Sequence, residues 1–212
     1  DEGITGWGEC SDYRVTNAVE GMVRDLAPLL VGKDPCAYEM RFIDMMRITR
    51  SSPGGITARA IAGIECALVD IAAQARNISV VELLGGPTRD RIRVYHTPQA
   101  KKIPPGGPYE HSLTPAEVEK IVANIKAARD AVGPGGAVMF DAHCAIPPAM
   151  LIQFANAIEP YDILFLEEVA VPGNIEVFKR LKQHIKIPMA TGERDRTIWE
   201  MLPYLHERCI DI

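Results

Sequence analysis

The sequence predicts an α/β protein in which a strand and several helices precede a run of alternating strands and helices. Three observations indicate this class. Residues 3–10 are strand-like and punctuated by glycine, residues 16–77 carry apolar side chains at helical spacing, and strand-like and helix-like segments alternate from residue 91 onward. Strand-helix-strand units with short connections form a parallel sheet, so the second part is either a barrel or a doubly wound fold.

Composition excludes several classes of protein. The chain has 212 residues, of which 47% are hydrophobic and 24% are charged, which is enough for one large or two modest domains. A net charge of -5 argues against a surface that binds nucleic acid. No apolar run reaches the roughly 18 residues of a membrane-spanning helix. The five cysteines are scattered and form no CxxC pair. We therefore expect a cytoplasmic protein with reduced thiols and without a nucleic-acid or membrane partner.

The first ninety residues predict a unit of one strand followed by helices. Glycines 3, 6 and 8 punctuate the strand over residues 3–10. Helices are expected over residues 16–34, 35–49, 57–77 and 80–87. Asp34 is expected to cap the second of these helices, with Pro35 at its first position. We assign residues 1–90 to one domain.

The remaining residues, 91–212, form the second predicted domain. Strands are expected over residues 91–96, 137–140, 162–166 and 187–192 and from residue 209, and helices from 115, over 148–158, 175–184 and 198–208. Thr114 and Glu117 have the spacing of a capping box, with Pro115 at the first helical position. Asn174 is expected to cap the helix that begins at residue 175.

Three successive strands of this domain lead to a carboxylate. Asp141, Glu167 and Glu193 are separated by 26 residues each time, which predicts the same level of one sheet. Neighbouring strands lie about 4.8 Å apart, so three carboxylates would repel one another unless a cation lay among them. Oxygen ligands completed by water suit Mg²⁺. The alternative is structural, because an acidic residue at a strand end often caps the next helix.

Three further side chains lie beside these carboxylates in the sequence. His143 shares the side of Asp141 if the strand continues to it, and it could then act as a general acid or base; the alternative is a solvated loop histidine. Glu168 should point away from the metal and support the barrel or a helix, so we do not expect it to be a ligand. Arg194 could pair with a substrate carboxylate or with a nearby acid.

At these motifs the chain resembles the enolase superfamily, in the mandelate racemase subgroup. The segments that carry the resemblance are "GITGWGEC", "AIAGIECALVDIAAQARNISVVELLGGPTRDRIRVYH", "MFDAH", "FLEE" and "ATGER". The resemblance implies a modified TIM (β/α) barrel with an N-terminal α+β capping domain. It also implies Mg²⁺ bound by Asp141, Glu167 and Glu193, and a homo-oligomer.

Within this subgroup, Asp-x-His at residues 141–143 is similar to the acid-sugar dehydratases. That similarity implies removal of the proton α to the carboxylate of a sugar acid, through an enediolate whose charge a cation stabilises. His143 then protonates the departing 3-hydroxyl, and Arg194 contacts the substrate. Two alternatives stay open, namely a racemase or epimerase of a carboxylate substrate and a catalytically silent member of the superfamily. The identity of the sugar acid is left open.

The chain also departs from the family pattern. Val169 stands where the family usually has proline after Glu167 and Glu168. The lysine-bearing second strand is not recognisable, and Lys101 or Lys102 represents its remnant. About 120 residues follow the capping domain, whereas a barrel needs about 200–250. The sixth to eighth strands, with the His-Asp pair expected to supply the base, are not present. We therefore expect an incomplete barrel in a chain that is not the whole gene product.

Overall fold

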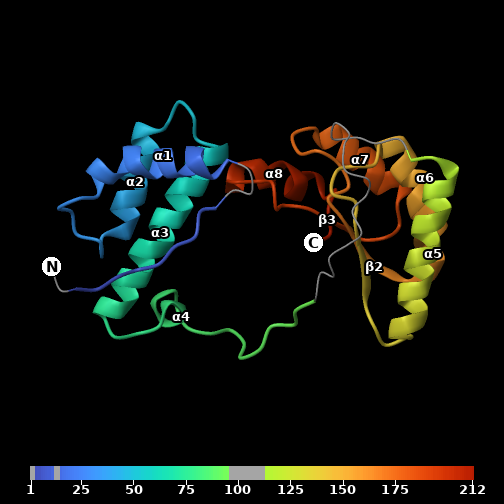
Figure 1. The fold of residues 1–212 in the computed structure, drawn as a ribbon, viewed down its shortest axis with the longest axis horizontal. Coiled ribbons are helices and arrows are strands. Elements are labelled where there is room, and N and C mark those ends of the chain that lie inside the picture. The colour runs from blue at the N-terminus through green and yellow to red at the C-terminus, as the bar shows by residue number, and fades with distance from the viewer. Residues whose placement is uncertain (1–2, 12–14, 96–112) are drawn as a thin grey trace. The chain divides into compact units, whose positions relative to one another are not determined.

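The computed structural model describes residues 3–11, 15–95 and 113–212 (Figure 1). The chain divides into two compact units, Asp1–His96 and Thr97–Ile212. Each unit has its own cluster of buried apolar side chains. Within the described ranges, no helix has the length and apolar character needed to cross a membrane.

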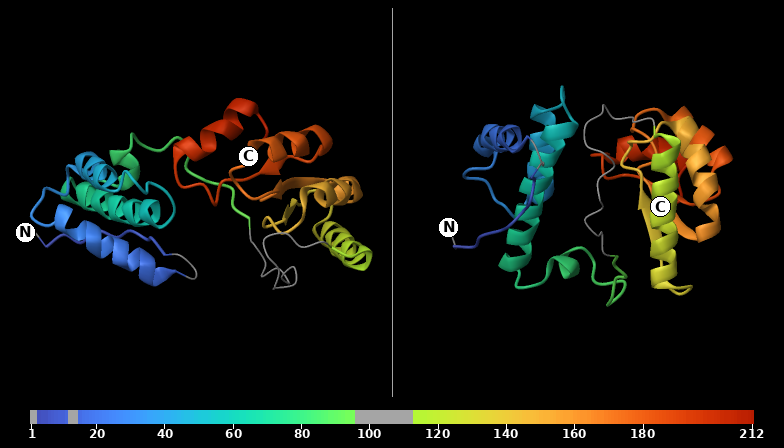
Figure 2. Two further views of the ribbon diagram at one scale, coloured as in Figure 1. Left: turned by 90° about the horizontal axis from the view of Figure 1, so that it is seen from above. Right: turned by 45° about the vertical axis from the view of Figure 1, so that its right-hand side comes forward.

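The first unit is built from helices. They are α1 (Thr16–Leu26), the 3₁₀ turn η1 (Ala27–Leu29), α2 (Tyr38–Ile48), α3 (Gly55–Ala75) and α4 (Val80–Leu83). α3 packs against both α1 and α2, and Figure 2 shows these helices side by side. Apolar residues recur on the inner faces of the helices, which buries Val19, Leu26, Met45 and Ile61 in one core. The helices predicted from spacing are thus confirmed, but the first ends at Leu26 and not at residue 34, and the fourth ends at Leu83 and not at residue 87.

The strand predicted for residues 3–10 is not formed. This segment is extended and lies along α3, where the backbone N–H of Trp7 donates to Asp70 Oδ2 at 2.9 Å. The Gln74 side chain donates to the carbonyl of Thr5 at 2.9 Å. The prediction is wrong because a strand needs a second strand to pair with, whereas here the side chains of a helix satisfy these backbone groups.

The start of α2 also differs from the prediction. Asp34 does not cap the helix, because its Oδ1 accepts a hydrogen bond from the backbone N–H of Cys36 at 2.8 Å. This local turn competes with capping, as short acidic side chains often do. The chain completes the turn first, and the helix begins at Tyr38 with Ala37 at the N-cap.

The second unit contains a parallel sheet in the order β1-β2-β3. Its strands are β1 (Val138–Asp141), β2 (Ile163–Glu167) and β3 (Met189–Ala190). Its helices are α5 (Pro115–Val132), α6 (Pro148–Ile158), α7 (Ile175–His184) and α8 (Ile198–Glu207), and the 3₁₀ turn η2 is Glu159–Tyr161. Each α-helix contacts the next along the chain (Figure 2). The strand-helix alternation predicted from sequence is confirmed.

Helix ends in this unit agree with the prediction in part. The capping box of Thr114 and Glu117 is present, with Pro115 in the first turn. Asn174 occupies the N-cap position of α7, but its side chain makes no capping hydrogen bond. The sequence pattern located this helix start correctly, while the capping contact itself did not form.

Two predicted strands are absent from the described ranges. Residues 91–95 have no strand structure, and residues 209–212 are not assigned to a strand. The latter segment nevertheless lies beside β3, because the N–H of Asp211 donates to the carbonyl of Met189 at 2.9 Å. The N–H of Thr191 donates to the carbonyl of Ile212 at 3.3 Å. The segment thus makes some strand-like hydrogen bonds without a full ladder.

Candidate active site at the ends of the parallel strands

Two of the three predicted metal ligands are neighbours at the end of the sheet. Asp141 ends β1 and Glu167 ends β2, and their Cα atoms are register partners. Parallel strands lie about 4.8 Å apart, so the two carboxylates leave the same edge of the sheet side by side. The sequence spacing correctly placed these two residues at one level.

Glu193 does not occupy that level. The residue of β3 that pairs with Glu167 is Ala190, so Glu193 follows three residues later, after the chain has left the strand. Gly192, with φ +135°, lies in this exit. The equal spacing of 26 residues therefore did not place Glu193 at the level of the other two carboxylates. Asp141 and Glu167 are the last residues of their strands, whereas β3 ends three residues before Glu193. The Glu193 side chain is 48% exposed.

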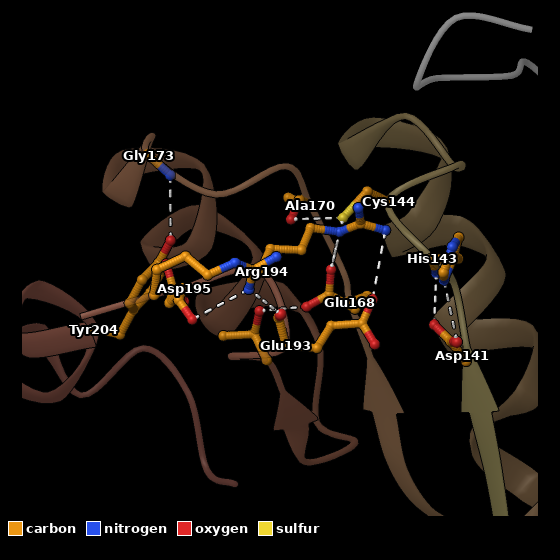
Figure 3. Close-up of polar contacts among 12 residues, drawn as sticks. Asp141, His143, Cys144, Glu168, Ala170, Gly173, Glu193, Arg194, Asp195 and Tyr204 are labelled. Carbon is orange, nitrogen blue, oxygen red and sulfur yellow. Dashed lines mark hydrogen bonds and ion pairs between the residues drawn. The ribbon is translucent and has the colours of Figure 1, made fainter. Parts of the chain in front are cut away.

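His143 lies beside Asp141, but not for the predicted reason. The strand ends at Asp141, and His143 follows in a turn with a left-handed φ of +50°. Its backbone N–H donates to Asp141 Oδ1 at 2.7 Å, and its Nδ1 lies 3.4 Å from Oδ2 (Figure 3). The imidazole is 63% exposed. A solvent-accessible imidazole beside a carboxylate can give or take a proton.

Glu168 is buried at the centre of a polar network that sequence analysis missed. Its side chain is fully buried, and it has a left-handed φ of +50° immediately after β2. Its Oε1 accepts a hydrogen bond from Thr191 Oγ1 at 2.9 Å. Its Oε2 accepts from Arg194 Nε at 2.5 Å and from Cys144 Sγ at 3.1 Å (Figure 3). Three donors therefore compensate the cost of burying this carboxylate.

Arg194 is paired with acids of its own chain. Besides the contact to Glu168, its Nη2 lies 3.6 Å from Glu193 Oε1. Partial burial has the largest single effect on the pKa of Arg194 and lowers it, but the hydrogen bond to Glu168 and the further interactions with Glu168 and Cys144 together outweigh it and hold the pKa above its usual value. The structure gives the second of the two expected alternatives, a nearby acid. A contact between Arg194 and substrate stays a prediction.

Cys144 completes the network on the β1 side. Its Sγ–H contacts Glu168 Oε2 and also the carbonyl of Ala170 at 3.2 Å. Burial, followed by the hydrogen bond to Glu168, raises the pKa of the thiol to about 12. Such a thiol is protonated at neutral pH, so its place in the site is structural.

The predicted metal ligands fit Mg²⁺ in donor type. All are carboxylates, Asp141 and Glu167 are adjacent, and Asp141 is 43% exposed, which leaves room for water ligands. Over the described ranges, no three His, Cys, Asp or Glu side chains lie close enough together to hold a metal ion. The ligand set therefore stays a prediction. Lys101 and Lys102, the candidates for the second-strand lysine, lie outside the described residues.

Family models match both parts of the chain. Residues 1–85 match the mandelate racemase / muconate lactonizing enzyme N-terminal domain, and residues 89–212 match the enolase C-terminal domain-like family. A D-galactonate dehydratase from Variovorax paradoxus is 33% identical over 98% of this chain and 59% of its own length. The chain thus spans about three fifths of the length of the curated relatives that it matches.

Solved structures share the fold. A member of the enolase superfamily from Salmonella Typhimurium has a TM-score of 0.90 and 26% identity, with 99% of this chain and 66% of that chain covered. An enolase from Agrobacterium radiobacter, solved with Na and L-malate, has a TM-score of 0.85 and 30% identity. That match covers 100% of this chain and 60% of the other. The chain therefore has the N-terminal domain and a part of the modified barrel of this superfamily, and the described sheet belongs to that part.

Proposed function

Because the chain belongs to the mandelate racemase / muconate lactonizing enzyme family of the enolase superfamily, we propose that the protein is a Mg²⁺-dependent hydro-lyase acting on a sugar acid. Several relatives at 32–33% identity are named D-galactonate dehydratase, which supports dehydration and a polyhydroxy acid substrate. The product is a 2-keto-3-deoxy acid. The homo-oligomeric state and the cytoplasmic location stay predictions.

In this proposal Asp141, Glu167 and Glu193 hold the cation. Mg²⁺, when bound, supplies positive charge beside the substrate carboxylate, which reduces the cost of removing the proton α to it. The carboxylates of the chain fix the position of the cation at the strand ends, where active sites of (β/α) barrels lie.

His143 is proposed to protonate the hydroxyl that leaves from carbon 3. The observation that carries the proposal is the turn after β1, which holds the His143 ring against Asp141 while Asp141 is in register with Glu167. With Nδ1 beside the Asp141 carboxylate, Nε2 is the ring nitrogen left to exchange a proton with the substrate. Hydroxide is a poor leaving group, so the elimination needs an acid at this place.

The substitution His143→Asn tests this role. We expect the formation of 2-keto acid to fall by about 10²–10⁴-fold, because the proton donor is lost, while exchange of the α proton with deuterated solvent continues. Keto acid formation is measured with a library of acid sugars and Mg²⁺, and exchange is measured by NMR. His184→Asn is the matched control, since His184 is an exposed histidine at the end of α7 whose Nδ1 contacts the carbonyl of Arg180. Unchanged dehydration in His143→Asn would contradict the role.

Calorimetry with Mg²⁺ tests the cation site independently of the chemistry. We expect Mg²⁺ binding that weakens in Glu193→Gln, because an amide oxygen carries no formal charge to attract the cation. Absence of binding, or binding insensitive to this substitution, would favour a catalytically silent protein. Inversion of the α carbon without keto acid formation would instead identify a racemase or epimerase.

A further inference from the structure

We propose that Glu168 is a positioning residue: its buried carboxylate fastens the turn that carries His143 and holds Arg194 in a closer contact than the one that Arg194 makes with Glu193. The functional meaning of the inference rests on the roles proposed above for His143 and Glu193. The contacts that carry it are properties of the fold and are independent of those roles.

Glu168 connects all three strand ends. Its backbone N–H donates to the carbonyl of Ala190 at 3.0 Å, and its own carbonyl accepts from the N–H of Cys144 at 2.8 Å. Its carboxylate accepts from Cys144 on the β1 side and from Thr191 and Arg194 on the β3 side. The turn after β1 and the loop after β3 are therefore held to the end of β2 by one residue.

Three proposed site residues, one at the end of each strand, are covalently next to a member of this network. His143 precedes Cys144, Glu167 precedes Glu168, and Glu193 precedes Arg194. Because adjacent Cα atoms are only about 3.8 Å apart, a backbone shift at a member of the network also moves its neighbour in the sequence. Figure 3 shows the Glu168 carboxylate below the Arg194 guanidinium and the Cys144 thiol in this view, with His143 and Asp141 to the right of Cys144.

Arg194 lies between two acids with different proposed tasks. It makes a close contact with buried Glu168 and a longer one, at 3.6 Å, with the half-exposed Glu193. If Glu168 lost its charge, Glu193 would be the charged carboxylate that is left of the two that contact the Arg194 guanidinium. The cation of Arg194 would then compete with Mg²⁺ for the Glu193 carboxylate.

Two substitutions at Glu168 distinguish the effect of its side-chain hydrogen bonds, which fasten the turn, from the effect of its negative charge. In Glu168→Gln the amide oxygen can accept from Cys144 and Arg194, and the amide N–H₂ can donate to Thr191 Oγ1, so the network keeps its shape and loses its charge. In Glu168→Ala the side-chain hydrogen bonds and the charge are both lost. We expect the amide of Cys144 to keep its hydrogen-exchange rate in Glu168→Gln and to exchange at least about tenfold faster in Glu168→Ala, as protection follows local opening.

Mg²⁺ affinity, measured by calorimetry on the full chain, tests the charge. We expect Glu168→Gln to weaken binding by about 10–100-fold, as is typical when a group that orients a metal ligand is changed. The double variant Glu168→Gln with Arg194→Met should restore binding, because the competing cation is gone. Thr191→Val is the matched control, since it removes one hydrogen bond to Glu168 and leaves its charge and its contact with Arg194 in place.

The outcomes separate this inference from the proposed function. Wild-type affinity in Glu168→Gln, or no recovery in the double variant, overturns the charge role while leaving the metal site intact. An unchanged Cys144 amide in Glu168→Ala overturns the fastening role. If the wild-type chain binds no Mg²⁺, the proposed metal site fails. The charge role is then tested by NMR, because the Arg194 Nε–H signal should shift between wild type and Glu168→Gln if the charge of Glu168 holds Arg194. An unshifted signal overturns that role.

Discussion

At the scale of single residues, the candidate site contains partly exposed polar side chains and buried ones, and the two kinds have different roles. Asp141 and His143 are partly exposed and contact each other, so they can exchange protons and ligands with solvent. Glu168 and Cys144 are buried and contact each other, so they are isolated from solvent. Burial raises the free energy of an uncompensated charge by several kcal/mol, which is why the buried acid has three donors.

Cys144 gives a prediction at this scale. With its pKa raised to about 12 by burial and by Glu168, the thiolate fraction at pH 8 is on the order of 10⁻⁴. We expect iodoacetamide to leave Cys144 unmodified in the native chain and to modify the exposed Cys66. Peptide mass spectrometry after brief labelling at pH 8 gives the two extents of modification. In urea both thiols should react, and rapid native labelling of Cys144 would contradict its burial.

At the scale of elements, close approach of the backbone explains why the segment over residues 3–11 follows α3. A Cβ atom at Gly8 would lie 1.9 Å from the carbonyl oxygen of Gly63, and one at Gly6 would lie 2.1 Å from that of Ala67. Both contacts are with backbone atoms of a helix, which cannot move aside as a flexible side chain can. Glycine is therefore required at these positions for contact, and not for a special φ.

Gly8→Ala tests this packing. We expect the substitution to destabilise the first unit by about 1–3 kcal/mol, because the added methyl group overpacks a rigid backbone contact. Gly21→Ala is the matched control, since no atom lies within 4 Å of its added Cβ and Gly21 is inside α1. The control should stabilise by about 0.5–1 kcal/mol through helix propensity. Urea unfolding followed by circular dichroism measures both, and equal effects would exclude the close packing.

At the scale of the whole molecule, carboxylates with opposite pKa shifts contribute to the dependence of stability on pH. Partial burial raises the pKa of Asp211, but hydrogen bonds from Lys182 and the Met189 N–H outweigh this and lower it. Burial, together with the nearby Glu200 and Glu168, raises the pKa of Asp195. A carboxylate with a lowered folded pKa stabilises the fold above its unfolded pKa, whereas one with a raised pKa costs stability there.

Lys182→Met tests the Asp211 contribution. The pairing is fully stabilising above the unfolded pKa of about 3.9, and it is lost as the pH falls through the lower folded value. We expect the variant to lose less free energy of unfolding than the wild type between pH 5 and pH 3, by up to about 1 kcal/mol, since the pair is partly exposed. Urea titrations at each pH measure this, and parallel curves for the two proteins would show that Lys182 does not lower the pKa of Asp211.

Much of the fold and part of the site follow from the sequence alone. Apolar periodicity located α1 and α3, the capping box at Thr114 located α5, and Asn174 marked the start of α7, because these signals depend on residues within a turn of one another. The alternation of strand and helix gave the parallel sheet, and strand-end motifs indicated the family. Asp141 and Glu167 were correctly paired because each directly ends its strand.

Only the tertiary structure decided how the strand ends are joined. Glu168 contacts Cys144 and Arg194 across sequence separations of 24 and 26 residues, which no local pattern encodes. The turn at His143 and the early exit of β3 before Glu193 depend on where each strand loses its neighbour. The sequence alone determined which residues could do chemistry; the packing of three strands decided which of them meet, because register and burial arise only when distant segments come together.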